Sequence, residues 1–274
     1  AEPMSTIDKV RDFYQQGGEE NRLEQGLGVV EGFRTKELIS RYLRPAMDIY
    51  DIGGGAGYYA DWMAAEGHRV TMLELAPSAV EKAKACQSAP YTAMTGDARC
   101  LPFPETSADV CLLLGPLYHL QEKEDRMQAL QEALRVLRSG GLLFAAGISK
   151  YSSMTWALSV YGLKNDYIDD PVYREMLREE LLTGRHCKPA QYNCLCDAYF
   201  HTPEGFQEEL AEAGFSVNAL YAVEGCAWLA PSLSEKWGNP ACRENLLSLV
   251  RMTEQEPSLL GLSPHFLAVA RAAN

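Results

Sequence analysis

Four glycines and one acidic residue meet where an apolar run gives way to a helical one, in the segment YDIGGGAGYYADWM (50–63). Gly53, Gly55 and Gly57 alternate after Asp51, and glycine is the residue that lets a backbone approach a ligand closely. A carboxylate ahead of such a loop would repel a pyrophosphate but suits a ligand that carries an ammonium or a sulfonium. The segment therefore predicts a loop that binds a positively charged small molecule.

The same loop also fits a second pattern. Gly55, Gly57 and Ala60 satisfy G-x-G-x-x-A, which brings a dinucleotide pyrophosphate to a helix N-terminus. A nicotinamide-dependent oxidoreductase (NAD(P)) is therefore an alternative, and Glu74 would supply its acidic residue after the second strand. That alternative gives Asp51 no role.

Two more acidic residues end the next two predicted strands, Glu74 in MLEL and Asp97 in GDA (96–98). The carboxyl ends of parallel strands meet at one edge of a sheet, where ligands bind in open α/β folds. A single acid at such a place is more often a helix cap. Three acids in succession predict a site.

The elements that must position these residues alternate between strand and helix four times. Predicted strands are 47–52, 69–75, 91–97, 108–115 and 141–149, and the helices between them are 58–67, 77–87 and 123–137. The strands are apolar throughout, which is typical of a parallel sheet covered by helices on both faces. The pattern predicts a doubly wound α/β domain.

Four segments follow from this pattern. They are an N-terminal helical cap (1–45) interrupted by glycines, the last of them Gly28, a cofactor-binding core (46–150), a helical insertion or lid (151–202) and the C-terminal part of the same domain (203–274). Within the insertion, helices are expected near 152–162 and 171–183, and the whole insertion is expected to lie over the carboxyl edge of the sheet.

Taken together, five motifs resemble those of the class I S-adenosylmethionine-dependent methyltransferases. They are DIGGGAG, MLEL, GDA, ADVCLLLGPLYHL and LRVLRSGGLLFAA, in the family's order and about one strand apart. The segments LLLGPLYHL, YFHTPEGF and EPSLLGLSPHFLAVAR further resemble a bacterial group of small-molecule methyltransferases related to quinone-biosynthesis enzymes. The resemblance implies a seven-stranded, mostly parallel sheet whose last strand is antiparallel, with 215–225 and 263–273 as its last two strands.

The resemblance also implies S-adenosylmethionine as cofactor and methyl transfer to an oxygen or nitrogen of a small-molecule acceptor. It places Glu74 at the ribose hydroxyls and Asp97 at the adenine amino group. The expected cofactor-binding residues are Asp51, Gly53, Gly55, Gly57, Tyr58, Glu74, Leu75, Asp97, Ala98, Leu114 and Tyr14. No metal ligand is expected, and the acceptor stays open.

The expected catalytic residues are His119 and Tyr118, which follow the fourth strand at the methyl-donor end of the pocket. His119 is a candidate base for an acceptor that must lose a proton, and a packed histidine is the alternative. Tyr14 and Tyr58 could contact the sulfonium by cation–π interaction or simply pack in the core.

Two further groups are open at this stage. Glu31 and Arg34 lie three apart on one predicted helix and are expected to form a surface pair, with a role in orienting the substrate as the alternative. The insertion supplies aromatic residues for a lid: Tyr167, Tyr173, Tyr192, Tyr199 and His201. Its histidines and cysteines, His186, Cys187, Cys194 and Cys196, depart from zinc-site spacing, so free thiols are expected.

The net charge and the length of the apolar runs indicate which kinds of partner the protein can bind. The formal net charge of −12 opposes binding to nucleic acid, and no apolar run approaches the length of a membrane helix. We expect a cytoplasmic monomer or homodimer with no nucleic-acid or membrane partner. A catalytically silent binding protein that keeps the cofactor fold is the rival from another functional class.

Overall fold

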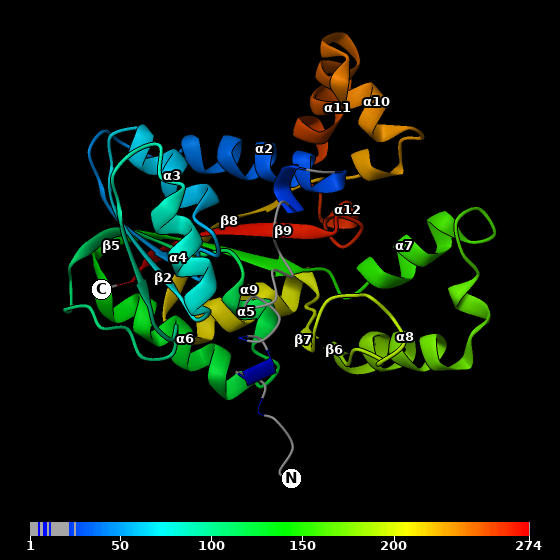
Figure 1. Ribbon diagram of the computed structural model, residues 1–274, viewed down its shortest axis with the longest axis horizontal. Coiled ribbons are helices and arrows are strands. Elements are labelled where there is room, and N and C mark those ends of the chain that lie inside the picture. Colours follow the sequence, from blue (N-terminus) through cyan, green and yellow to red (C-terminus); the bar gives the residue numbers. More distant parts are fainter. Residues whose placement is uncertain (1–4, 6–7, 10, 12–21, 25, 274) are drawn as a thin grey trace.

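The computed structural model describes residues 5, 8–9, 11, 22–24 and 26–273, and a seven-stranded sheet forms its centre (Figure 1). The strand order is β3-β2-β1-β4-β5-β9-β8. The strands are β1 (Asp48–Ile52), β2 (Arg69–Glu74), β3 (Thr92–Thr95), β4 (Ala108–Leu113), β5 (Leu137–Ile148), β8 (Phe215–Ala222) and β9 (His265–Ala272).

Strand directions follow the predicted pattern. The first five strands pair in parallel, whereas β9 runs antiparallel to both β5 and β8. The predicted seven-stranded, mostly parallel sheet with an antiparallel last strand is therefore confirmed. The chain moves outward from β1 in one direction to β3 and in the other to β4 and β5, which places a topological switch point between β1 and β4.

Helices cover both faces of the sheet. One face packs against α2 (Leu27–Ser40), α3 (Tyr58–Ala65) and α4 (Pro77–Ala85), and the other packs against α5 (Pro116–His119), α6 (Lys123–Val136) and α9 (Pro203–Glu212). Along β4, Val110 and Leu112 pack in the core on the α2, α3 and α4 side of the sheet. Cys111 and Leu113 pack in the core on the α5, α6 and α9 side. Both faces of the strands are buried, which explains their continuous apolar sequence.

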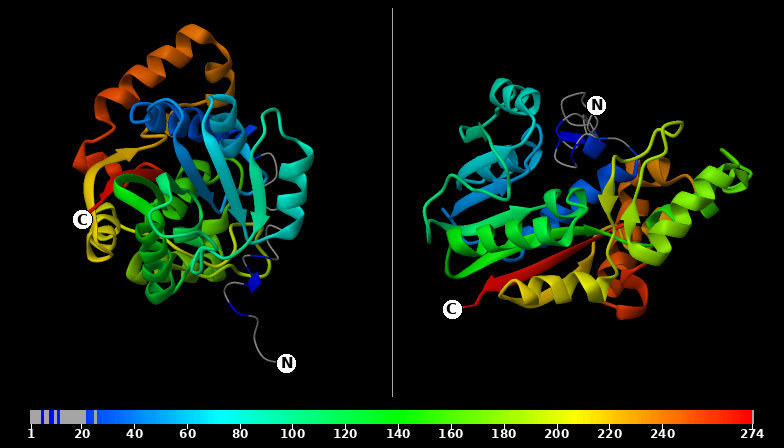
Figure 2. Two further views of the ribbon diagram at one scale, coloured as in Figure 1. Left: turned by 90° about the vertical axis from the view of Figure 1, so that its left-hand side faces the viewer. Right: turned by 90° about the horizontal axis from the view of Figure 1, so that it is seen from below.

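The insertion projects beyond the sheet at the end where β9 begins (Figures 1 and 2). It contains α7 (Ser152–Val160), a 3-10 turn at Tyr167–Asp169 and α8 (Pro171–Thr183). The two short strands β6 (Arg185–His186) and β7 (Ala198–Tyr199) pair as a separate sheet that the sequence did not predict. The remaining helices, α10 (Leu233–Gly238), α11 (Pro240–Thr253) and α12 (Pro257–Leu260), lie between β8 and β9 in the chain.

Two predicted boundaries were wrong. β5 begins at Leu137, before the glycine pair, because Leu137 pairs with Ala108 while Leu142 pairs with Val110, so Gly140 and its neighbours form a bulge inside the strand. Gly28 lies inside α2 and does not interrupt it, since the helix begins after Gly26. Among the described residues, no helix combines the length and apolar character needed to span a membrane.

Candidate cofactor and acceptor site

The loop between β1 and α3 requires its glycines. Gly53, Gly55 and Gly57 have φ values of 79°, 58° and 92°, in the region that other residues rarely adopt. A Cβ atom on Gly53 would lie 2.5 Å from Pro116 Cγ, and one on Gly57 would lie 2.1 Å from the Tyr91 hydroxyl oxygen. A Cβ on Gly55 would meet no atom within 4 Å, so open space adjoins the middle of the loop.

Asp51 lies buried beneath this loop. Its Oδ2 atom has no hydrogen-bond partner among the described residues. Burial, and to a smaller extent the charge of Glu74, raises the pKa of Asp51 to about 7. A buried carboxylate without a partner is costly in the free protein, and a bound cation would relieve that cost.

Glu74 ends β2 and faces the same loop. Its Oε2 accepts a hydrogen bond from the Gly55 main-chain nitrogen at 2.9 Å, and its Oε1 accepts one from Ala76 at 3.3 Å. Burial raises the pKa of Glu74, and these backbone donors offset part of that effect. The carboxylate is therefore fixed at the loop in a partly desolvated position.

Asp97, two residues beyond β3, is held by Arg99. The Arg99 Nη2 atom donates to Asp97 Oδ2 at 2.9 Å, and the Arg99 main-chain nitrogen donates to Oδ1 at 2.9 Å. Despite partial burial, these bonds lower the pKa of Asp97, so this carboxylate is ionised at neutral pH. Arg99 also bonds Asp125 in α6, which ties the loop after β3 to that helix.

A cavity opens at the carboxyl ends of β1 to β4. It is lined by Gly53, Leu73, Glu74, Leu75, Gly96, Asp97, Ala98, Gly115, Pro116, His119 and Leu120. Six of the residues proposed from sequence are in this lining: Gly53, Glu74, Leu75, Asp97, Ala98 and His119. Five other lining residues were not proposed, although each lies inside one of the motifs MLEL, GDA and ADVCLLLGPLYHL: Leu73, Gly96, Gly115, Pro116 and Leu120.

His119 ends the short helix α5 and is almost fully buried. Desolvation, with a smaller contribution from the positive charge of Arg22, lowers its pKa to about 3. Its Nδ1 atom lies 3.6 Å from the Sγ atom of Cys196, which the insertion contributes. A general base works best when its pKa is near the working pH, so in the free protein His119 is a neutral and weak base.

Other proposed residues lie beside the cavity. Tyr118 is buried against Ile148, Ala198 and Phe200, and Leu114 packs in the core cluster on the α2 side. The Tyr58 ring lies 4.2 Å from Lys36 Nζ in α2, outside the cavity lining. Tyr14 falls outside the described residues.

The expected surface pair of Glu31 and Arg34 was wrong. Both side chains are buried, and they bond different partners. Arg34 donates to the main-chain oxygens of Val223 and Ala222 at 2.8 and 3.1 Å and pairs with Glu254 at 2.7 Å. Arg34 therefore fastens α2 to the end of β8. Both residues do lie in one helix, as predicted, but their spacing does not reveal which face of α2 is buried by the rest of the protein.

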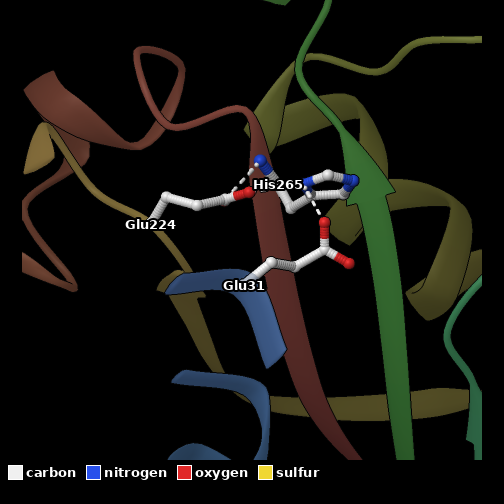
Figure 3. Close-up of side chains that lie close together, drawn as sticks. All are labelled: Glu31, Glu224 and His265. Carbon is white, nitrogen blue, oxygen red and sulfur yellow. Dashed lines mark hydrogen bonds and ion pairs between the residues drawn. The ribbon is translucent and has the colours of Figure 1, made fainter. Parts of the chain in front are cut away.

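Glu31 instead belongs to a buried cluster with Glu224 and His265 (Figure 3). The His265 Nδ1 atom lies 2.6 Å from Glu224 Oε2 and 3.2 Å from Glu31 Oε1. Arg22 forms an ion pair with Glu31. Sequence analysis did not single out Glu224 or His265, although His265 lies within the segment EPSLLGLSPHFLAVAR.

The aromatic residues of the insertion separate into two groups. Tyr167, Tyr173 and Tyr192 pack against one another at centroid distances of 4.9 to 5.3 Å, around the insertion's own small core. The ring centroids of Tyr199 and His201 lie 4.7 Å apart. The Arg126 guanidinium carbon lies 3.8 Å from the centroid of the Tyr199 ring. None of the five lines the cavity described above.

The cysteines near residue 190 do not converge on one point. Cys196 Sγ faces His119, while Cys194 Sγ lies 4.0 Å from His186 Nε2. His186 also pairs with Glu180 at 2.5 Å inside the insertion. None of the eight cysteines of the chain forms a disulfide bond.

Part of the chain is similar in sequence to a known protein family. Residues 50–145 match the family described as "Methyltransferase domain". The chain is 33% identical over 99 residues to a malonyl-[acyl-carrier protein] O-methyltransferase of Serratia marcescens, covering 36% of this chain and 37% of that protein. It is 30% identical over 149 residues to a rice 2-methyl-6-phytyl-1,4-hydroquinone methyltransferase, covering 51% and 40%. The matches thus span less than half the length of both relatives.

The fold extends over the whole chain. The crystal structure of magnesium protoporphyrin IX methyltransferase from Synechocystis with bound SAH superposes with a TM-score of 0.60 at 14% identity, covering 98% of this chain and all of that one. The matched domain contains the glycine loop and the ends of β1 to β4, where the cavity lies. This domain and the sheet topology are similar to those of the class I S-adenosylmethionine-dependent methyltransferases.

Proposed function

We propose that this protein transfers a methyl group from S-adenosylmethionine to an oxygen or nitrogen of a small-molecule acceptor by in-line displacement. The cofactor supplies a methyl group on a sulfonium, and the displacement removes the positive charge from sulfur. The observation that carries the proposal is the cavity at the switch point, where Glu74 and Asp97 line the wall and the unpartnered Asp51 lies beneath the glycine loop.

The residues present fit the cofactor. Glu74 would hold the ribose hydroxyls and Asp97 would face the adenine, both from the cavity wall. Asp51 would balance positive charge on the methionine part, since its Oδ2 is buried without a partner among the described residues. The open space beside Gly55 gives room for a ligand against the main chain. Asp97 would keep its bond to Arg99 and offer its remaining acceptor capacity.

His119 and Pro116 bound the cavity at its β4 end, where the methyl group would point. Their proposed task is to exclude water and align the acceptor, because orientation alone supplies about 7 to 11 kcal/mol in favourable cases. Eight cysteines that form no disulfide bond support a cytoplasmic, reducing location. We also propose that the protein acts as a monomer or homodimer on a small molecule, without nucleic acid.

Titration calorimetry with S-adenosylhomocysteine and with NAD tests the proposal. We expect the first to bind in a 1:1 ratio and NAD not to bind. Release of S-adenosylhomocysteine from S-adenosylmethionine in the presence of a mixed metabolite extract would then show turnover. Binding of NAD alone would support the oxidoreductase, and cofactor binding without turnover in any extract would support the silent binding protein.

A further inference from the structure

His265 lies at the same edge of the sheet as the proposed cofactor site. It opens β9 and pairs with Ile148, the last residue of β5, and β5 is the neighbour of β4. The Tyr118 ring stands between two histidines, with centroids 4.8 Å from His119 and 6.2 Å from His265. His265 therefore follows the cofactor acids and His119 along this edge, beyond the methyl-donor end.

Two glutamates fix the His265 ring. Its Nδ1 atom faces Glu224 Oε2 at 2.6 Å and Glu31 Oε1 at 3.2 Å, and its main-chain nitrogen donates to Glu224 Oε1 at 3.0 Å. Carboxylates accept hydrogen bonds, so Nδ1 must carry a proton. Glu224 is fully buried, and its carboxylate is therefore held in place as well.

The second ring nitrogen is available. Figure 3 shows Nε2 at the end of the ring turned away from Glu224. No hydrogen bond among the described residues uses it, and it is not one of the buried side-chain atoms that lack a partner. The His265 side chain keeps 17% exposure, so this edge of the ring can meet a ligand.

The charges around His265 favour its cationic form. Although desolvation opposes it, the charges of Glu31 and Glu224 raise the pKa of His265 to about 9, against a smaller opposing effect of Arg22. The same Arg22 charge lowers the pKa of His119, so the guanidinium lies within electrostatic reach of both rings. At neutral pH one histidine is charged and the other is neutral.

We propose that His265, oriented by Glu31 and Glu224, binds a carboxylate of the methyl acceptor through its Nε2–H group. The inference rests on the proposed function and names its acceptor class. One carboxylate oxygen would accept from Nε2 while the other attacks the methyl carbon. The C–O bond forms and the C–S bond breaks, with its electron pair going to sulfur. The negative and positive charges cancel and no proton moves, so a weak base at position 119 suffices.

A divalent cation is the competing ligand for these three side chains, whose donor atoms lie within 4.8 Å of one another. Such an ion would have to displace the Nδ1 proton and to tolerate the nearby Arg22 charge. In the cluster as it stands, two carboxylates face one imidazolium and one guanidinium, so its charge is already balanced. A further cation would therefore meet no uncompensated negative charge, whereas the Nε2–H group is a hydrogen-bond donor that suits an anion. The anion is the proposed ligand, and the cation is an outcome of the test.

The test is a histidine side-chain NMR titration of the full chain saturated with S-adenosylhomocysteine. Acetate is the probe because its small size tests the charged group and not the shape of an unknown acceptor, and acetamide is its neutral control. We expect acetate, but not acetamide, to shift the His265 Nε2 signal at pH 7.5, while the buried His68 signal stays unchanged. The Glu224→Gln variant should bind acetate several-fold more weakly at pH 7.5 and recover at pH 5.5, where its imidazole is protonated again.

His265→Gln should lose the acetate effect, whereas His68→Gln, which removes another buried histidine, should keep it. An unmoved His265 signal, an equal response to acetamide, or 1:1 binding of Zn²⁺ at Nδ1 that excludes acetate would each overturn the inference. The wild-type titration decides the question even where a variant fails to fold. Failure of S-adenosylhomocysteine itself to bind would instead refute the proposed function.

Discussion

At the scale of single residues, Asp51 gives the most direct test of the proposed cofactor. It is a buried acid with an unpartnered oxygen in a protein whose proposed ligand is a cation. Its pKa of about 7 in the free protein should fall when a positive charge binds, because an opposite charge favours the ionised form. Binding must then release a proton near neutral pH.

The first prediction concerns pH. The affinity for S-adenosylhomocysteine should rise about tenfold between pH 5.5 and 7.5 and level off above the pKa of free Asp51. Calorimetry in buffers of different ionisation enthalpy would measure the released proton. Asp51→Asn should bind more weakly and lose this pH dependence. A wild-type affinity that is flat across this range would remove Asp51 from the site.

The second prediction concerns His119. His119→Ala should leave the affinity for S-adenosylhomocysteine within about threefold and lower the turnover number by roughly ten- to a hundredfold, through lost alignment of the acceptor. Since burial lowers the pKa of His119 to about 3, the wild-type rate should show no inflection from this residue between pH 5 and 8. Steady-state kinetics with any acceptor checks both points, and unchanged rates would assign His119 to packing alone.

The order of motifs was sufficient to find the acids at the strand ends, because each one ends an apolar run. His265 and Glu224 could not be found in this way. His265 is the first residue of β9, and Glu224 lies just beyond the last residue of β8. The two side chains meet because β9 pairs antiparallel with both β5 and β8, which brings the start of β9 next to the end of β8. Their sequence neighbours give no sign of that pairing, and a long-range contact of this kind carries no local pattern.

At the scale of elements, α2 is fastened to the sheet through Arg34. The guanidinium is completely buried, bonds two main-chain oxygens at the end of β8 and pairs with Glu37 and Glu254. The helix was predictable from its apolar spacing. Its buried arginine was not, since a charged residue on a helix is more often exposed.

The third prediction follows from this contact. Arg34→Met should lower the free energy of unfolding by about 3 to 5 kcal/mol, because it leaves buried carbonyls and carboxylates without a donor. Urea unfolding at pH 7 measures the change. The control is Arg69→Met, whose ion pair with Asp48 is exposed to solvent and should lower the free energy of unfolding far less. Equal losses in the two variants would contradict the anchoring role of Arg34.

The insertion shows where element prediction stops. Its two helices follow from composition and periodicity, and α7 and α8 lie where they were expected. The strands β6 and β7 are two residues each, too short for an alternating pattern to be detected. The tyrosines were a natural choice for a lid, but Tyr173 and Tyr192 belong to the insertion's own core and Tyr167 packs against them. A count of aromatic residues cannot distinguish such a core from a binding wall.

At the scale of the whole molecule, the alternation of strand and helix determines where the site must be. Strand order reverses at β1, so the loops after β1 and β4 separate and leave a crevice at the carboxyl edge. The cavity lies there and is lined by Glu74, Asp97 and His119, while His265 lies outside the lining, 6.2 Å from the Tyr118 ring. Topology predicts this place in the fold, while the acceptor depends on side chains from β9 and α2 that topology does not specify.

The fourth prediction uses the stability of the whole chain. A ligand present at about 100 times its dissociation constant stabilises the native state by about 2.7 kcal/mol, which corresponds to roughly 5 to 10 °C in Tm for a domain near this size. Calorimetric scans should show this rise with S-adenosylhomocysteine and none with NAD. Because Glu74 lines the cavity, Glu74→Ala should weaken binding by about 1 to 3 kcal/mol, which removes from about a third to about nine tenths of the rise at the same ligand concentration. Glu66→Ala, at an exposed position, should retain the rise. A rise with NAD would support the oxidoreductase, and an undiminished rise in Glu74→Ala would place the ligand somewhere other than the edge formed by β1 to β4.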